Sequence, residues 1–175
     1  VRKQILLQRH RTARLRWAQR YRHLQIVHWE HVIFSNEARF LLHRVDGRIR
    51  VRRLPGQQLL EDCVLPRVQG GGGGVTIWGA FHSGAKCDLY MLEGHMNQEQ
   101  YIHVLQTVML PFARRDFRAN FVFQDDNATA HRARRVTEFL DNENVEHMDW
   151  KALSPDMNPI EHLWADLSRR LGEMV

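Results

Sequence analysis

Three short polar stretches of the sequence carry the residues best suited to chemistry. They are residues 33–37 (IFSNE), 123–127 (FQDDN) and 154–161 (SPDMNPIE). The first two coincide with apolar runs typical of buried strands, and the third contains two prolines and leads into a run typical of a helix. Side chains at the ends of such elements, although far apart in the sequence, can converge on one site.

One oxygen-bearing side chain from each stretch could contribute to a cation site: Asn36, Asp126 and Glu161. Carboxylate and amide oxygens suit hard cations such as Mg²⁺. Two such ions can hold the attacking and leaving oxygens of an in-line phosphoryl transfer. Because position 36 carries an amide where such a site needs a carboxylate, the pattern predicts a phosphoryl-transfer site that lacks one of its acids.

Each of these residues also has a purely structural interpretation. Residues 158–161 (NPIE) fit an N-cap, a proline at the first helical position and the acid of a capping box. Asp126 could end a strand, with its neighbour Asp125 as a rival ligand, and Asn36 could close a turn. Spacing alone leaves both interpretations open.

Basic residues are concentrated near the start of the chain. Residues 1–29 hold eight Lys or Arg and no acid, whereas the remaining 146 residues carry 17 bases against 20 acids. A second arginine cluster lies within residues 44–53. Such clusters suit a polyanion because each neutralised phosphate releases counterions, although a solvated arginine-rich helix is the open alternative. The candidate contacts are Arg14, Arg16, Arg48, Arg50, Arg52 and Arg53.

Length and composition indicate one globular domain. A chain of 175 residues can bury about 70% of its unfolded surface. Cys63 and Cys87 form neither a CxxC pair nor a disulfide framework, which favours a reducing, intracellular setting. No apolar run approaches the roughly 18 residues of a membrane span, so we expect a soluble protein without a membrane partner.

Periodicity and turn residues predict the elements that must position the polar stretches. The segment at residues 54–74 contains two prolines and five consecutive glycines, which predicts a long loop. No Gly-Lys-Ser or Gly-Lys-Thr follows the glycines, which argues against a phosphate-binding loop. The element order predicts an α/β protein whose mixed sheet is covered on both faces. Helices are expected at residues 9–24, 97–112, 129–140 and from 158 onward, and strands at 32–35, 40–42, 75–81, 89–92, 121–123 and 145–150, with a hairpin turn at 46–47.

The combination of motifs resembles the catalytic domain of Tc/mariner superfamily DNA transposases. The matching segments lie within residues 10–172: they are 32–37, 71–79, 123–127 with His131, and 154–164. The metal-binding acids of that family fall on Asn36, Asp126 and Glu161. Between the last two lie 34 residues, and with Glu as the final member this resembles the Tc-like, Asp-Asp-Glu branch more than the mariner branch.

The resemblance implies an RNase H-like fold: a mixed five-stranded sheet flanked by helices, with an inserted loop or hairpin region. It assigns residues 1–30 to a basic helical linker and residues 31–175 to the catalytic domain, with the insertion at residues 44–74. The abrupt basic start at Val1 suggests the C-terminal part of a longer protein, and a DNA-binding region is expected to precede it.

The resemblance further implies a nuclear cut-and-paste transposase. Such an enzyme uses two Mg²⁺ or Mn²⁺ ions to cleave double-stranded DNA at transposon ends and to transfer the cut strands into TA targets. Its synaptic complex is expected to contain a homodimer. His131 and Asn127 are possible accessory residues, and the arginines named above would contact the DNA.

The amide at position 36 predicts an impaired enzyme. It brings no charge, and its nitrogen cannot bind a second ion. If this costs the transition state about 3–5 kcal/mol, the rate falls by roughly 10²- to 10⁴-fold. Asn36 is explained either by an engineered substitution that traps a complex or by a decayed or repurposed copy, and the otherwise intact motifs favour the first. A domesticated DNA- or protein-binding module without catalysis is the alternative function.

Overall fold

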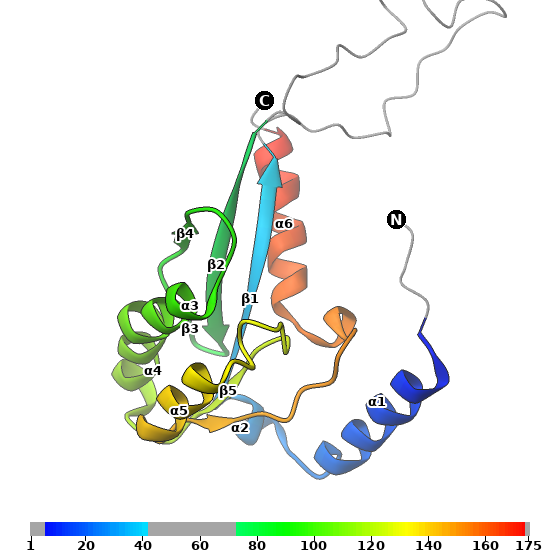
Figure 1. Cartoon of the computed structure of the whole chain (residues 1–175). Coiled ribbons are helices and arrows are strands. Elements are labelled where there is room, and N and C mark those ends of the chain that lie inside the picture. The colour runs from blue at the N-terminus through cyan, green and yellow to red at the C-terminus, as the bar shows by residue number, and fades with distance from the viewer. Residues whose placement is uncertain (1–5, 42–72, 174–175) are drawn as a thin grey trace, which may run out of the picture. The chain divides into compact units, whose positions relative to one another are not determined.

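A six-stranded sheet forms the centre of the fold. The computed structural model describes residues 6–41 and 73–173 (Figure 1). The chain divides into two compact units, residues 1–38 with 76–175 and residues 39–75. The strands are β1 (Val32–Leu41), β2 (Gly74–His82), β3 (Ala85–Lys86), β4 (Tyr90–Leu92), β5 (Val122–Gln124) and β6 (Glu146–His147).

The sheet is mixed, as predicted. Its strand order is β3-β2-β1-β5-β6, and β4 pairs with β2 beside this path. The pairs β1–β5 and β5–β6 are parallel, whereas β2 is antiparallel to both β3 and β4. The sheet has one strand more than the five predicted, because β3 and β4 pair with different parts of β2.

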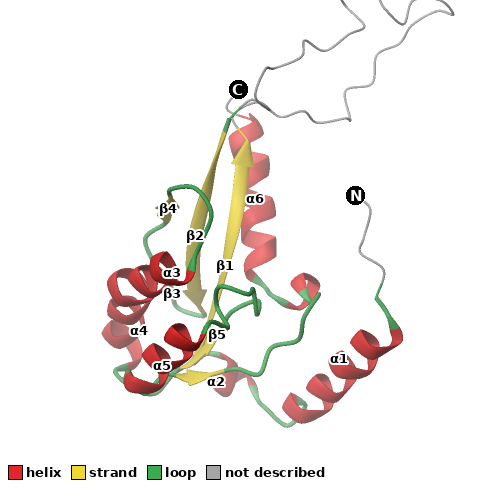
Figure 2. Cartoon of the chain, viewed as in Figure 1, coloured by secondary structure: helices red, strands yellow, loops and turns green. Residues whose placement is uncertain are grey.

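Helices alternate with the strands after β4 (Figure 2). The predicted helix at residues 97–112 is longer than expected, because α3, a π-helical turn and α4 follow one another without a break as far as Phe117. It begins with a capping box, in which Asn97 accepts from the backbone N–H of Gln100 and Gln100 accepts from the backbone N–H of Asn97. The helices are α1 (Gln8–Tyr21), α2 (Ile26–Trp29), α3 (Gln98–Val104), η3 (Leu105–Met109), α4 (Leu110–Phe117), α5 (Arg134–Asn142), η4 (Pro155–Met157) and α6 (Ile160–Glu173).

Two apolar clusters lie on opposite faces of the sheet, because successive strand residues alternate between faces. Ile33 and Phe123 belong to the larger cluster, which includes residues of α3, η3, α4 and α5. Their neighbours Val32 and Val122 belong to a smaller aromatic cluster with residues of α1 and α2. The parallel register, with Ile33 opposite Phe123, places each pair on the same face.

The first strand differs from the prediction. Residues 32–35 and 40–42 were expected to form separate strands, but β1 runs without interruption from Val32 to Leu41. Residues 36–39 (NEAR) are polar or small, and polar positions in a strand resemble a break when only hydrophobicity is considered. They stay in the strand because some of these polar side chains face the site described below.

Two elements near β5 are shorter than predicted. The helix expected from residue 129 begins only at Arg134, because the Ala128 carbonyl accepts from the N–H groups of both His131 and Arg132 and the chain forms turns there. The strand expected at residues 145–150 is confined to Glu146–His147. The hairpin turn at residues 46–47, Cys63 and all but the end of the loop at residues 54–74 lie outside the described residues.

In the described ranges, no helix combines the length and apolar character that a membrane span requires. Cys87, the cysteine within the described residues, is buried and has a free thiol.

Candidate active site

The structure brings the three predicted site residues to one pocket. Asn36 lies in β1, Asp126 lies two residues after β5, and Glu161 lies in the first turn of α6. All three line a pocket of about 340 Å³. The amide Nδ2 of Asn36 donates a hydrogen bond of 2.7 Å to Oε1 of Glu161, so two of the three polar groups are in direct contact.

Asn158 places α6 against β1. Its Oδ1 accepts from the backbone N–H of Ile160 at 3.2 Å, and its Nδ2 donates to the carbonyl of Ser35 at 3.0 Å. The cap interpretation of residues 158–161 is therefore confirmed for Asn158. The Glu161 carboxylate, however, accepts from the Asn36 side chain in β1. The cap and the candidate site are parts of one arrangement.

Asp125 and Asp126 have different environments. Asp125 is 1% exposed, and its carboxylate accepts from Tyr101 Oη at 3.2 Å, from His147 Nε2 at 3.0 Å and from Arg132. Asp126 instead lines the pocket. Asp125 is thus fully occupied by interior partners, which argues against the rival-ligand interpretation.

Asn127 holds the turn that follows these two acids. Its φ of 65° lies in the left-handed region, which Asn tolerates better than most residues. Its Nδ2 donates to the carbonyl of Trp150 at 2.6 Å, and its backbone N–H donates to Asp125 Oδ1 at 3.0 Å. The predicted accessory residue therefore orients the loop that carries Asp126.

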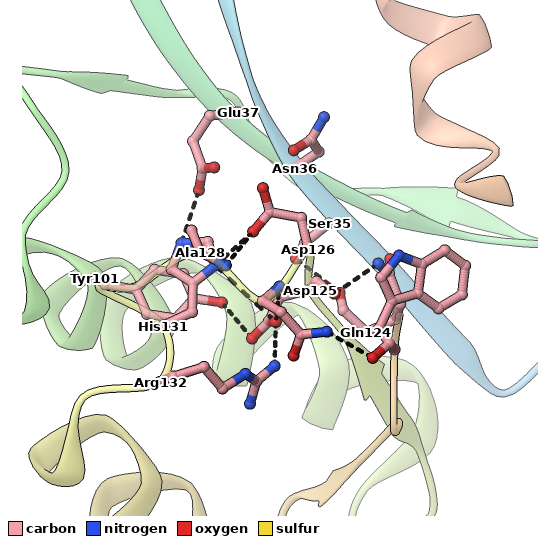
Figure 3. Close-up of polar contacts among 12 residues, drawn as sticks. Ser35, Asn36, Glu37, Tyr101, Gln124, Asp125, Asp126, Ala128, His131 and Arg132 are labelled. Atoms are coloured by element: carbon pink, nitrogen blue, oxygen red, sulfur yellow. Dashed lines mark hydrogen bonds and ion pairs between the residues drawn. The ribbon is translucent and has the colours of Figure 1, made fainter. Parts of the chain in front are cut away.

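His131 lies between two carboxylates (Figure 3). Its Nδ1 is 3.0 Å from Asp126 Oδ1, and its Nε2 is 3.4 Å from Glu37 Oε1. The imidazole is 2% exposed and stacks on Tyr101, with ring centroids 3.8 Å apart. The sequence analysis did not predict that Glu37 contacts the site through His131. The available signal was its position next to Asn36 in a strand.

Ligand atoms of Glu37, Asp126 and His131 all lie within 4.8 Å of one another, a spacing that a metal ion could bridge. Neither Glu37 nor His131 is among the residues that line the pocket. The imidazole itself bridges the two carboxylates, so we interpret this group as the support of Asp126.

Burial and neighbouring charges shift three pKa values in the site. Burial lowers the pKa of His131, but its contacts with Asp126 and Glu37 outweigh burial and raise it to about 9. Burial raises the pKa of Asp126, yet bonds from His131 and from the Ala128 N–H leave it below the ordinary value. Burial raises the pKa of Glu161, and the bond from Asn36 offsets this only in part.

The donor set fits one divalent cation better than two. Asp126 and Glu161 supply carboxylate oxygens to the same pocket, which are ligands that Mg²⁺ prefers. The Asn36 amide nitrogen, by contrast, points a proton at Glu161. An N–H group cannot bind a cation, so this residue cannot bridge two ions as a carboxylate would.

The predicted DNA-contacting arginines fall into three groups. Arg16 lies on α1 and is exposed. The side chain of Arg14, on the same helix, is 18% exposed and forms an ion pair with Asp156. Arg48, Arg50, Arg52 and Arg53 lie outside the described residues.

The fold is RNase H-like, as comparison with solved structures shows. The crystal structure of the mariner Mos1 paired end complex with Mg matches with a TM-score of 0.76 at 22% identity, over 98% of this chain and 52% of that chain. The crystal structure of the catalytic domain of Mos1 mariner transposase matches with a TM-score of 0.69 at 20% identity, over 99% and 76%. At these identities the likeness concerns the fold alone.

The chain belongs to the DDE superfamily endonuclease family, which matches residues 31–174. It is 37% identical to the Transposable element Tc1 transposase of Caenorhabditis elegans over 172 residues, and 33% identical to the Transposable element Tcb1 transposase of Caenorhabditis briggsae over 171 residues. These relatives confirm the resemblance to Tc/mariner transposases. Both matches include 98% of this chain, and the chain spans 63% of the length of each relative.

Proposed function

We propose that this chain is the catalytic domain of a cut-and-paste DNA transposase and that Asn36 leaves it with little or no activity. The observation that carries the proposal is the pocket where the Asn36–Glu161 hydrogen bond lies beside Asp126. Family membership and the identity to Tc1 transposase support the reaction class. The reaction is cleavage of DNA strands followed by strand transfer.

Asp126 and Glu161 would hold a divalent cation, Mg²⁺ or Mn²⁺. A bound ion supplies Lewis-acid stabilisation of the charge that develops on a phosphate. The chain's own contribution is to keep Asp126 ionised and oriented, through the N–H of Ala128 at 2.9 Å and the nearby His131. With Asp at position 36, the same pocket would offer three carboxylates, which would suit two ions.

The proposed substrate is double-stranded DNA, namely transposon ends and TA target sites. Solved neighbours of the fold include a Mos1 transposase paired-end complex with left transposon end and a Mos1 strand transfer complex. Other neighbours are Mos1 structures with Mg or with Mn. We propose a homodimer in the synaptic complex of the longer protein, and a nuclear location because its substrate is chromosomal DNA.

The test is Mn²⁺-dependent strand transfer of a pre-cut oligonucleotide supplied in excess. We compare this chain with Asn36→Asp and expect the rate to rise by roughly 10²- to 10⁴-fold. Asn36→Asp combined with Asp126→Asn is the matched control and should remain inactive. Equal, negligible activity in the unaltered chain and in the Asn36→Asp variant, with Mn²⁺ binding verified, would contradict the proposal.

A binding module without catalysis is the second candidate. The Asn36–Glu161 hydrogen bond favours it, because it satisfies the Glu161 carboxylate without any cation. DNA binding that is tight and unchanged by Asn36→Asp, together with no cleavage, would support this module over the transposase.

A further inference from the structure

Arg14 makes three contacts with one loop far away in the sequence. From α1, its Nη1 donates to Oδ1 of Asp156 at 2.8 Å and to the carbonyl of Leu153 at 3.3 Å, and its Nη2 donates to Oδ2 of Asp156 at 2.6 Å. A bidentate guanidinium–carboxylate pair fixes geometry as well as charge. The Arg14 side chain is 18% exposed, so it faces the protein rather than a ligand in solvent.

The loop that Arg14 holds is one wall of the candidate active site. Seven of the residues that line the pocket come from this part of the chain: Trp150, Ala152, Leu153, Ser154, Pro155, Asn158 and Glu161. Leu153 has a φ of 56°. A left-handed conformation is unfavourable for a leucine and persists only where surrounding contacts impose it. The bond from Arg14 to the Leu153 carbonyl is such a contact.

A second contact from α1 reaches the start of the same wall. The ring of Trp17 lies edge-on to the ring of Trp150, with centroids 5.0 Å apart. The Trp150 carbonyl accepts from Asn127, the residue after Asp126. The wall is therefore attached to α1 at Trp150 and again at Leu153 and Asp156, and at Trp150 it is also attached to the loop of Asp126.

We infer that Arg14 is a positioning residue that fixes the pocket wall at residues 153–156, and that α1 is part of the active-site architecture. Arg14 then acts on the site through Leu153 and Asp156 rather than through a DNA phosphate, the role predicted from its charge. The effect on catalysis rests on the proposed function, whereas the effect on the wall does not.

Amide hydrogen exchange tests the wall without any need for activity. In this chain, Arg14→Ala should raise exchange of the Met157 and Asn158 amides, which donate to the carbonyls of Ser154 and Pro155, by about tenfold or more, because the contacts that close the loop are lost. Arg20→Ala is the matched control: Arg20 lies on the same helix, is 65% exposed and pairs with Asp149 outside the pocket lining. That control should leave exchange of these amides unchanged.

Strand transfer tests the effect on the site. In the Asn36→Asp chain, Arg14→Ala should lower the rate at saturating DNA by about 10- to 100-fold, the usual effect of losing a partner that orients a ligand. The rate of Arg14→Lys should lie between that of the chain with Arg14 intact and that of Arg14→Ala, because Lys keeps the charge but cannot form the bidentate pair. The exchanged pair Arg14→Asp with Asp156→Arg should recover only part of the rate and of the protection of the loop, because an Asp at position 14 restores the ion pair but cannot donate to the Leu153 carbonyl.

Two outcomes would overturn the inference. One is unchanged exchange of the Met157 and Asn158 amides in Arg14→Ala. The other is a loss of DNA affinity with a smaller salt dependence in Arg14→Ala, accompanied by an unchanged rate at saturating DNA, since that is the behaviour of a phosphate contact. If the Asn36→Asp chain itself is inactive, the proposed function fails, and the exchange measurement alone decides the role of Arg14.

Discussion

At the scale of single residues, the adjacent acids Asp125 and Asp126 have different roles. Asp125 is enclosed by Arg132, His147 and Tyr101, and Asp126 lines the pocket. A buried carboxylate is costly unless its charge is matched and hydrogen-bonded, and Asp125 meets both conditions. Its role is to hold the end of β5, and this leaves Asp126 as the acid that is available to a cation.

We expect Asp125→Asn to lower the free energy of unfolding by about 2–4 kcal/mol, near the range for breaking a buried ion pair. Burial raises the pKa of Asp125, but bonds from His147 and nearby charges leave it below the usual value. A lowered pKa in the folded state gives stability above the ordinary Asp pKa that is lost as pH falls below it. The cost of Asp125→Asn should therefore be largest near neutral pH and shrink below about pH 4.

Urea unfolding between pH 3 and pH 7 measures this difference. Asp141→Asn is the control, because Asp141 is exposed and lies in α5 away from the pocket. A cost for Asp125→Asn that matches the control at neutral pH would show that the buried pairs contribute nothing.

At the scale of elements, α6 packs closely on β2, and this contact fixes where Glu161 lies. A Cβ added at Gly79 in β2 would lie 2.7 Å from Cη2 of Trp164 and 3.1 Å from Cδ2 of Leu89. Trp164 follows Glu161 by less than one helical turn. The absence of a side chain at position 79 therefore allows the approach that brings Glu161 to Asn36.

We expect Gly79→Ala to destabilise the fold by about 1–3 kcal/mol, the usual cost of overpacking a tight contact. Because the added methyl would push on the Trp164 ring of α6, Mn²⁺ affinity in the Asn36→Asp background should fall as well. Thermal unfolding and calorimetric Mn²⁺ titration measure the two effects. Gly84→Ala is the matched control, since a Cβ there would lie 3.6 Å from its nearest neighbour. Equal melting temperatures for the two variants would refute this explanation of Gly79.

The sequence predicted the presence of helices and strands better than the residues at which they begin and end. Long periodic segments such as residues 97–112 gave helices, because an apolar face repeats over several turns. The turns at residues 128–133 look helical in composition, and only the bonds to the Ala128 carbonyl reveal them. Motif resemblance brought Asn36, Asp126 and Glu161 together. The choice between Asp125 and Asp126 required the structure, because adjacent residues in an irregular loop follow no period.

At the scale of the whole molecule, charge is divided between a basic first segment and a slightly acidic remainder. Residues 1–29 carry eight bases and no acid, yet one of these bases, Arg14, is directed inward. Fewer of these basic side chains are therefore available to bind a polyanion than the composition suggests. Neither net charge nor helical periodicity could reveal this, because Asp156, the partner of Arg14, is 142 residues away.

We expect the DNA-binding constant to fall steeply as the salt concentration rises. The slope of log K against log salt should depend on Arg16. Removing one phosphate contact lowers the slope of log K against log salt by about 0.9, so Arg16→Ala should show a decrease of this size. Fluorescence anisotropy with a duplex oligonucleotide at several salt concentrations measures it. Arg134→Ala is the control, because Arg134 is 85% exposed on α5 and pairs with Glu138. An unchanged slope for Arg16→Ala would remove Arg16 from the DNA surface.

The amide at position 36 also has a genetic consequence. Asn and Asp have the same shape, and their codons differ only in the first base, A or G. An Asp at position 36 in β1 would fill the same space, but the hydrogen bond that Asn36 donates to Glu161 would be replaced by two neighbouring carboxylates, which a bound cation would hold together. A single transition in the gene separates the two forms, so this domain lies one mutational step from a complete set of acids.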